Sequence, residues 1–303
     1  MITIQTLLDL LEQSGYEFTF EGDPNTALSG FSSLSQYREG TVAWARNSEA
    51  LKGINVEKIS CVVLPAGLDA PAPNRIVVDD PRRIFFFLIE RVWGEPKKPA
   101  GVGAHTFVSP EARIGKNVSI GCNCTIDGPV VIGEGTVIEH NVTLLNRVEI
   151  GNDCIVHSGA VIGGDGFGYT YDENNRPVKI EHFGGVRLGD RVEVGANACI
   201  DRGVIDDTVV GQDTKIDDLV HIAHNAQVGD AVIAIMGTNI CGSAVVGAHC
   251  YFAPGAIIKN GVHIGENSFL GMGVVASGNV EPNTMLYKKP PLKLKNVDYR
   301  KLL

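Results

Sequence analysis

An aliphatic side chain occupies every sixth position of the chain from Val108 to Ile162. This period fits neither the 3.6-residue turn of an α-helix nor the two-residue alternation of a half-buried strand. It is the signature of a parallel β-helix built from hexapeptides, in which each sixth side chain points into a narrow core and the Gly or Asn beside it forms a tight corner. The series comprises Val108, Ile114, Ile120, Ile126, Ile132, Ile138, Leu144, Ile150, Val156 and Ile162.

The repeat is interrupted once and changes phase once. It stops after Ile162 and returns at Leu188, so residues 163–187 are expected to be an insertion that leaves the coil. Because three hexapeptides make one coil, residues eighteen apart should lie one above the other, about 4.8 Å away. After Ile200 the phase slips, and the inward positions are then predicted to be Val204, Val210, Ile216, Ile222, Val228, Ala234, Ile240, Val246, Phe252, Ile258, Ile264, Leu270 and Ala276.

The N-terminal residues follow a different pattern and predict a small α/β domain at 1–98. Amphipathic helices are expected at 3–15 and 81–92, the second with Asp80 as its cap and Pro81 at its first position. Short apolar runs predict strands at 31–34, 42–45, 61–64 and 75–78. The solenoid is then predicted at 99–281, with a short basic tail at 282–303.

The charge balance restricts the function. The chain of 303 residues has a formal net charge of −9, which argues against binding nucleic acid through phosphate contacts. It has no apolar run as long as a membrane span and no signal-like leader, so a cytoplasmic protein is expected. The basic tail is expected to be either a solvated strap over the last coil or a dock for an acidic partner such as a carrier protein.

The insertion is the first candidate site. A loop of this length is uncommon in a regular coil unless it has a function. Its glycines would let backbone and aromatic groups approach a ligand closely, which makes Asp165, Phe167, Gly168 and Tyr169 candidate substrate contacts. The alternative is a tolerated surface hairpin. No Gly-Lys-Ser/Thr sequence ends the glycine run, so a phosphate-binding loop is not expected.

Two histidines that follow one another closely form the second candidate site. The eighteen-residue spacing places Asp206 beneath His224, where a carboxylate could hold the imidazole and stabilise its protonated form. Asp217 is a second candidate for this orienting role. Because no Ser or Cys is placed as a nucleophile, the pattern favours direct transfer with His224 as general base. His221 and Asn225 are expected to contact the substrate.

Three motifs carry a family resemblance. They are Asp165-Gly166-Phe167-Gly168-Tyr169, Ile200-Asp201-Arg202-Gly203 with Asp206-Asp207-Thr208-Val209, and Ile222-Ala223-His224-Asn225. They strongly resemble those of the UDP-3-O-(3-hydroxyacyl)glucosamine N-acyltransferases of lipid A biosynthesis. The resemblance implies a left-handed β-helix, a homotrimer with active sites between subunits, and no bound cofactor or metal. It also implies transfer of a hydroxyacyl group from an acyl carrier protein thioester to the amine of a UDP-linked glucosamine, with His224 as the catalytic base and Asp217 as the upstream acid.

The resemblance extends to the N-terminal domain, where Trp44 and Asn47 match two of three uracil-binding positions and Ala50 stands where the family has Tyr. Stacking on an aromatic ring is worth about 1–3 kcal/mol per base. Trp44 could alternatively be a core residue. Gly261 replaces a second family histidine, and the backbone amide of Gly242 is the expected substitute for an oxyanion. The family's helical C-terminal extension is expected to be shortened here.

Three alternatives remain open at this point. An acetyl-CoA-dependent acetyltransferase would act on the same kind of nucleotide amino sugar and differ in its acyl-CoA donor. A γ-type carbonic anhydrase shares the solenoid but requires three His ligands for zinc, and the histidines here form no obvious set of three. A non-catalytic paralogue would bind the nucleotide sugar without acting on it.

Overall fold

The structure is a computed structural model that describes residues 2–96 and 98–289. The chain folds into two compact units, Met1–Lys97 and Lys98–Leu303. Neither helix in the described part of the chain combines the length and the apolar character that a bilayer crossing requires. Most of the basic tail, residues 290–303, lies outside the described residues.

The N-terminal unit packs two helices on a five-stranded sheet. Both predicted helices are confirmed, as α1 (Ile4–Gln13) and α2 (Pro81–Trp93), and Asp80 Oδ1 accepts a hydrogen bond from the Arg83 amide at 3.0 Å. The strands of the sheet, in spatial order, are β2 (Thr19–Glu21), β7 (Arg75–Val78), β6 (Cys61–Pro65), β5 (Thr41–Trp44) and β4 (Gly30–Phe31). A separate pair joins β1 (Ile2–Thr3) and β3 (Ala27–Leu28).

The predicted strand at 31–34 is wrong beyond its first residue. Residues Leu34–Gln36 form a short 3₁₀ turn, in which the Gln36 amide donates to the Ser33 carbonyl at 3.3 Å instead of extending the sheet ladder. Two further 3₁₀ turns cover Ser48–Leu51 and Val56–Lys58.

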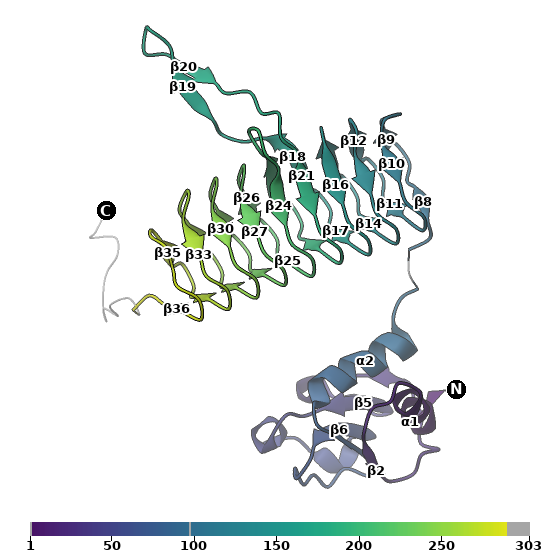
Figure 1. Ribbon diagram of the computed structural model, residues 1–303. Coiled ribbons are helices and arrows are strands. Elements are labelled where there is room, and N and C mark those ends of the chain that lie inside the picture. Colours follow the sequence, from purple (N-terminus) through teal and green to yellow (C-terminus); the bar gives the residue numbers. More distant parts are fainter. Residues whose placement is uncertain (1, 97, 290–303) are drawn as a thin grey trace, which may run out of the picture. The chain divides into compact units, whose positions relative to one another are not determined.

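Three parallel sheets form the faces of the solenoid (Figure 1). The first has eight strands: β10 (Arg113–Ile114), β13 (Val131–Ile132), β16 (Val148–Ile150), β21 (Val186–Leu188), β24 (Thr208–Val210), β27 (Gln227–Val228), β30 (Val245–Val246) and β33 (His263–Ile264). The second has ten: β8 (Gly101–Val102), β11 (Ser119–Ile120), β14 (Val137–Ile138), β17 (Ile155–Val156), β22 (Glu193–Val194), β25 (Lys215–Ile216), β28 (Ile233–Ala234), β31 (Tyr251–Phe252), β34 (Phe269–Leu270) and β36 (Met285–Leu286). The third has nine: β9 (Phe107–Val108), β12 (Thr125–Asp127), β15 (Thr143–Leu145), β18 (Val161–Asp165), β23 (Cys199–Arg202), β26 (His221–Ile222), β29 (Asn239–Ile240), β32 (Ile257–Ile258) and β35 (Val275–Ala276).

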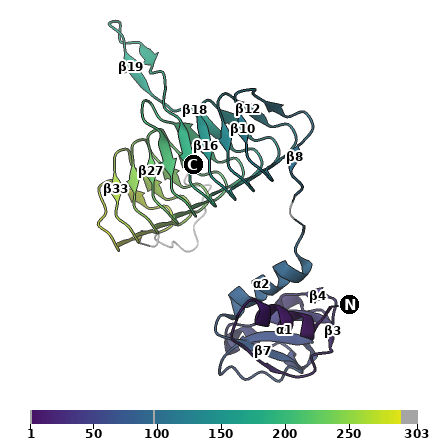
Figure 2. The same cartoon turned by 45° about the vertical axis from the view of Figure 1, so that its right-hand side comes forward.

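The insertion forms a hairpin that projects from the stack of coils, as Figures 1 and 2 both show. Its two strands, β19 (Tyr169–Tyr171) and β20 (Pro177–Lys179), pair only with each other. The chain then returns to the coil, where Leu188 pairs with Ile150 and Val210.

Outside the insertion, the eighteen-residue spacing holds in most coils; it fails at one corner and in the last coil, where Leu270 pairs with Leu286. Ile120 pairs with Ile138 as expected, but Ile200 pairs with Ile222, at a separation of 22 residues. Four extra residues therefore lie in the corner between β23 and β24. Val204 falls in this extension and is only half-buried, so its predicted inward position is wrong.

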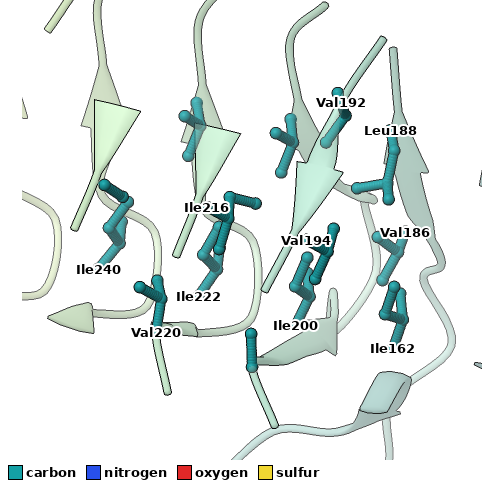
Figure 3. Packing of buried hydrophobic residues seen from close by; sticks show 14 of the residues in the cluster. Ile162, Val186, Leu188, Val192, Val194, Ile200, Ile216, Val220, Ile222 and Ile240 are labelled. Carbon is teal, nitrogen blue, oxygen red and sulfur yellow. The ribbon is translucent and has the colours of Figure 1, made fainter. Parts of the chain in front are cut away.

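The other inward positions from Ile120 onward are buried and form one continuous column, part of which Figure 3 shows. Ile114 is 38% exposed, because its strand β10 is the first of its sheet. Each coil thus buries its apolar side chains on the next, which is how a solenoid replaces a single large core.

The corner glycines and asparagines have separate roles. A Cβ on Gly133 would lie 2.4 Å from the carbonyl oxygen of Gly151, so glycine at this position permits close stacking of the coils. The left-handed corner itself is formed two positions later, often by Asn, as at Asn117 and Asn123 with φ near 57° and 58°. Asn tolerates this backbone conformation better than most residues.

Candidate active site

His224 lies at the corner that follows β26, and one contact decides which of its nitrogens is basic. Its Nδ1 is 3.2 Å from Oδ1 of Asn225. That oxygen also accepts the Val204 amide at 3.0 Å, while Nδ2 of Asn225 donates to the Asp206 carbonyl at 3.1 Å. Both bonds involve backbone groups and so fix which end of the amide is oxygen. His224 therefore donates through Nδ1–H, and its Nε2 keeps the lone pair that a general base requires.

The structure corrects both predicted carboxylate partners of His224. Asp206 does not hold the imidazole, because the four extra residues displace it into an extended corner where only its backbone carbonyl is joined to Asn225. Asp217 does not orient His224 within the chain either. It follows β25 at a different corner, where Oδ2 accepts the Met236 amide at 2.9 Å. An amide, Asn225, takes the place predicted for an acid.

Two glycines lie directly against the His224 ring. A Cβ on Gly242, in the next coil, would be 2.7 Å from both Nε2 and Cε1 of His224. A Cβ on Gly166, in the insertion, would be 2.9 Å from Cβ and Cδ2 of the same residue. The Gly242 amide donates to no group within residues 2–96 and 98–289. The structure thus brings together His224, Asn225, Gly242 and the insertion.

His182 is a site residue that the sequence did not reveal. It is 2% exposed and lies edge-on to His224, with 5.6 Å between the ring centroids and 83° between the ring planes. Gly168 packs against it, since a Cβ there would be 3.2 Å from the His182 ring. Its position lies outside the hexapeptide repeat, so no period in the sequence pointed to it.

The other predicted residues of the insertion divide into anchoring and exposed groups. Asp165 accepts hydrogen bonds from Lys179 at 2.5 Å and from Arg202 at 2.7 Å, and the bond from Lys179 contributes most to lowering the pKa of Asp165. The carboxylate therefore connects β20 of the hairpin to β23. Phe167 is 87% exposed and Tyr169 46%, and their rings are 4.9 Å apart, so they are available to a ligand.

His221 belongs to a separate pair on the outer face of its sheet. Its Nε2 is 3.0 Å from Oδ2 of Asp201, and this hydrogen bond raises the pKa of the imidazole. No hydrogen bond joins the His221 ring to His224 in the described part of the chain, and the two rings do not form an aromatic pair there. A substrate contact by His221 would therefore involve its Nδ1 side.

A second cluster that the sequence did not reveal lies beside this corner. The buried carboxylate of Asp207 accepts hydrogen bonds from Arg147 and from the Gly185 amide at 2.7 Å, and it forms an ion pair with Arg187 at 2.8 Å. Burial alone would raise the pKa of Asp207, but these donors outweigh it and lower the value. The cluster borders a cleft of about 680 Å³ whose wall includes Asn225.

The N-terminal unit has its own pocket, of about 690 Å³. Trp44 and Ala50 line it, together with the basic side chains of Arg46 and Arg82. Trp44 also packs toward Phe85, at 6.5 Å between ring centroids, so it serves the core and the pocket together. Asn47 is not in the pocket wall; its Oδ1 accepts the Ala50 amide at 3.1 Å and caps a 3₁₀ turn.

Two further hypotheses from the sequence concern a second histidine of the family and a possible zinc site. His263, near the position where the family has a second histidine, is exposed on β33. Among the described residues, no three His, Cys, Asp or Glu side chains gather in a way that could hold a metal ion.

Comparisons with known proteins agree on the fold. The bacterial transferase hexapeptide model matches residues 111–146 and 129–164, and the hexapeptide repeat of succinyl-transferase matches 243–276. The UDP-N-acetylglucosamine acyltransferase of Francisella novicida is similar with a TM-score of 0.56 and 25% identity, covering 61% of this chain and 66% of that one. The Bacteroides fragilis enzyme gives 0.55 and 28%, covering 61% and 70%. The predicted left-handed parallel β-helix is confirmed.

Relatives in sequence share one name. UDP-3-O-acylglucosamine N-acyltransferase of Coxiella burnetii is 32% identical over 284 residues, covering 87% of this chain and 83% of the relative. The proteins of that name from Delftia acidovorans and Pseudomonas syringae are 33% and 34% identical, covering 84% and 72% of this chain and 78% and 68% of their own lengths. The chain therefore belongs to the UDP-3-O-acylglucosamine N-acyltransferase family, a family of hexapeptide-repeat acyltransferases.

Proposed function

We propose that this protein transfers an acyl group from a thioester to the amine of a UDP-linked, O-acylated glucosamine. The observation that carries the proposal is the state of His224: Nδ1–H donates to Asn225, and Nε2 is the basic nitrogen, which lies beside Gly242 of the next coil. As the amine nitrogen bonds to the thioester carbon, Nε2 removes the amine proton, and the thiolate leaves. General base catalysis of this kind contributes about 10²- to 10⁴-fold in rate.

The Gly242 amide supports the same chemistry. Its N–H lies in the coil next to His224 and donates to no described group, which suits it to stabilise the oxyanion that forms on the thioester carbonyl. This role replaces the second family histidine, which is Gly261 here.

The N-terminal pocket is the proposed nucleotide site. Trp44 offers a ring for uracil to stack on, and Arg46 and Arg82 offer positive charge to a diphosphate. Because Asn47 caps a turn, its contribution to uracil binding would come from Nδ2.

The donor is proposed to be an acyl carrier protein thioester, reached through the basic tail, and the assembly a homotrimer. The exposed Phe167, Phe183 and Ile205 around the insertion are apolar surface that a second copy would cover. Light scattering in solution should give the mass of three chains. A monomer at micromolar concentration would contradict the trimer.

The function is tested by offering acyl carrier protein thioesters of several chain lengths, and acetyl-CoA, against a panel of UDP-amino sugars. We expect transfer from a hydroxyacyl carrier protein to the O-acylated UDP-glucosamine. Transfer from acetyl-CoA alone would assign an acetyltransferase. Binding of the nucleotide sugar without transfer from any donor would indicate a non-catalytic paralogue.

A further inference from the structure

One buried nitrogen lacks a partner, and it lies beside the proposed catalytic base. In the described part of the chain, Nε2 of His182 is the only buried side-chain nitrogen or oxygen that forms no hydrogen bond. The imidazole is 2% exposed and 5.6 Å from that of His224. Since nearly all buried polar groups in native proteins are paired, this exception calls for a physical explanation.

The tautomer of a neutral His182 ring is fixed by its other nitrogen. Nδ1 is 2.9 Å from the carbonyl oxygen of Ile180, which can only accept, so Nδ1 carries the hydrogen. Nε2 of the neutral ring is therefore a hydrogen-bond acceptor. The backbone on both sides is held: the Ile180 amide donates to Gly168 at 2.9 Å, and the Phe183 amide donates to Val204 at 2.8 Å.

A purely structural role does not account for histidine here. An apolar ring of similar size would fill the same space without burying an unpaired acceptor, which costs free energy. In native proteins such groups are explained by a catalytic role, by stored strain or by a bound water or ion, and local rules are most often broken at functional sites. A ligand that brings a hydrogen-bond donor would complete the site.

The space between the two imidazoles indicates where that donor would lie. The point that a Cβ on Gly166 would occupy is 2.9 Å from both Cβ and Cδ2 of His224 and 3.1 Å from Nε2 of His182. A group placed near this point is within hydrogen-bond distance of Nε2 of His182 and next to Cδ2, the ring carbon bonded to Nε2 of His224. Gly166 now covers it; Gly166 and Gly168 lie between β18 and β19, outside any strand, so the backbone there can rotate with less steric resistance than other residues would meet.

We propose that Nε2 of His182 accepts a hydrogen bond from the acceptor amine of the sugar, an inference that rests on the proposed function. The amine has two hydrogens. One passes as a proton to Nε2 of His224 while the nitrogen–carbon bond forms and the carbon–sulfur bond breaks, and the leaving thiolate then takes that proton. The other hydrogen bonds to His182, which gains no proton and directs the nitrogen lone pair at the thioester carbon.

The test compares His182→Phe, which removes the acceptor, with His182→Gln, whose Oε1 can replace it. For His182→Phe we expect kcat/KM for the UDP-amino sugar to fall about 10- to 100-fold, affinity for UDP alone to stay unchanged, and the melting temperature to stay equal or rise. His182→Gln should keep kcat/KM within about threefold of wild type, because the hydrogen bond is retained.

Other outcomes separate the two proposals. If the wild type acylates no UDP-amino sugar, the proposed function fails and the role of His182 fails with it. If the wild type is active and His182→Phe matches it, only the role of His182 is wrong. A lowered melting temperature together with weaker binding of UDP alone would show that His182 is structural, and that too would overturn the proposal.

Discussion

The regular coils and the interrupted corner at His224 differ in how their polar side chains are satisfied. In the regular coils, corner side chains bond the backbone of the neighbouring coil: Asp217 Oδ2 accepts the Met236 amide, and Asp230 Oδ1 accepts the Gln212 amide. Beside the interrupted corner, Nε2 of His182 is the only buried side-chain nitrogen or oxygen within residues 2–96 and 98–289 that has no hydrogen bond. The buried side-chain group that is free to bind a ligand therefore lies where the regular stacking is interrupted, next to His224.

The largest difference in effect between the two regions is expected when one histidine is removed from each. His224→Ala should lower turnover by about 10²- to 10⁴-fold, because the general base is lost, with little change in melting temperature. His263→Ala, on an exposed position of the regular coils, should leave turnover within about twofold. Steady-state kinetics on purified variants measure both, and equal losses would remove the distinction between the two regions.

A smaller effect is expected from crowding the base. In Gly242→Ala the new Cβ would lie 2.7 Å from Nε2 of His224, so the imidazole must move, and turnover should fall by about 10- to 100-fold. Gly278→Ala is the matched control, since its Cβ would meet no heavy atom within 4 Å. Full activity in Gly242→Ala would mean that the position of the imidazole does not limit the rate.

The next effect concerns stability. Asp207→Asn should lower the free energy of unfolding by about 1–3 kcal/mol at neutral pH, because Arg147 and Arg187 lose a buried anion. The folded-state pKa of Asp207 is depressed, so its contribution is present above the ordinary value of 3.8 and is lost as the pH falls below it. Denaturant titrations should therefore show a smaller difference in the free energy of unfolding between wild type and Asp207→Asn at pH 3 than at pH 7. Asp213→Asn, at an exposed pair with Arg191, is the control and should change little.

The smallest effect is expected at the pair of His221 and Asp201. The pKa of His221 is raised in the folded protein. The stability that the protonated pair contributes is therefore fully present below the pKa of the unfolded state, and it is lost as the pH rises through the pKa of the folded state. His221→Gln should therefore destabilise the protein by less than about 1 kcal/mol near pH 5.5, given the partial exposure of the pair, and by nothing measurable near pH 9. A difference in stability between wild type and His221→Gln that increased with pH would contradict this assignment.

The sequence predicted the core of the solenoid because burial there depends only on a period that can be counted. Ile120, Ile162 and Ile222 are buried where the hexapeptide rule places them. The rule failed at Val204 and Asp206 for one reason: four extra residues in a corner shift the count without changing which strands pair. Residue spacing finds neighbours only while every coil has the same length.

The candidate site was predicted in part. His224 and Asn225 of one motif lie beside Gly242, as the eighteen-residue spacing indicated, but the group that holds His224 is an amide and not a carboxylate. His182 was missed because it lies in the returning limb of an insertion, where no period relates it to His224. His182 is recognised only in the three-dimensional structure, where its Nε2 is buried without a hydrogen bond.

The register of the third sheet has a consequence for how such proteins diversify. Ile162 stacks on Ile200 and Ile200 on Ile222, although an excursion separates the members of each pair and the two excursions differ in length. The packing of the aliphatic core thus does not depend on the length of the segments between strands. Loops at the corners can be lengthened, shortened or exchanged independently, so new substrate preferences can arise on this scaffold while its core packing stays the same.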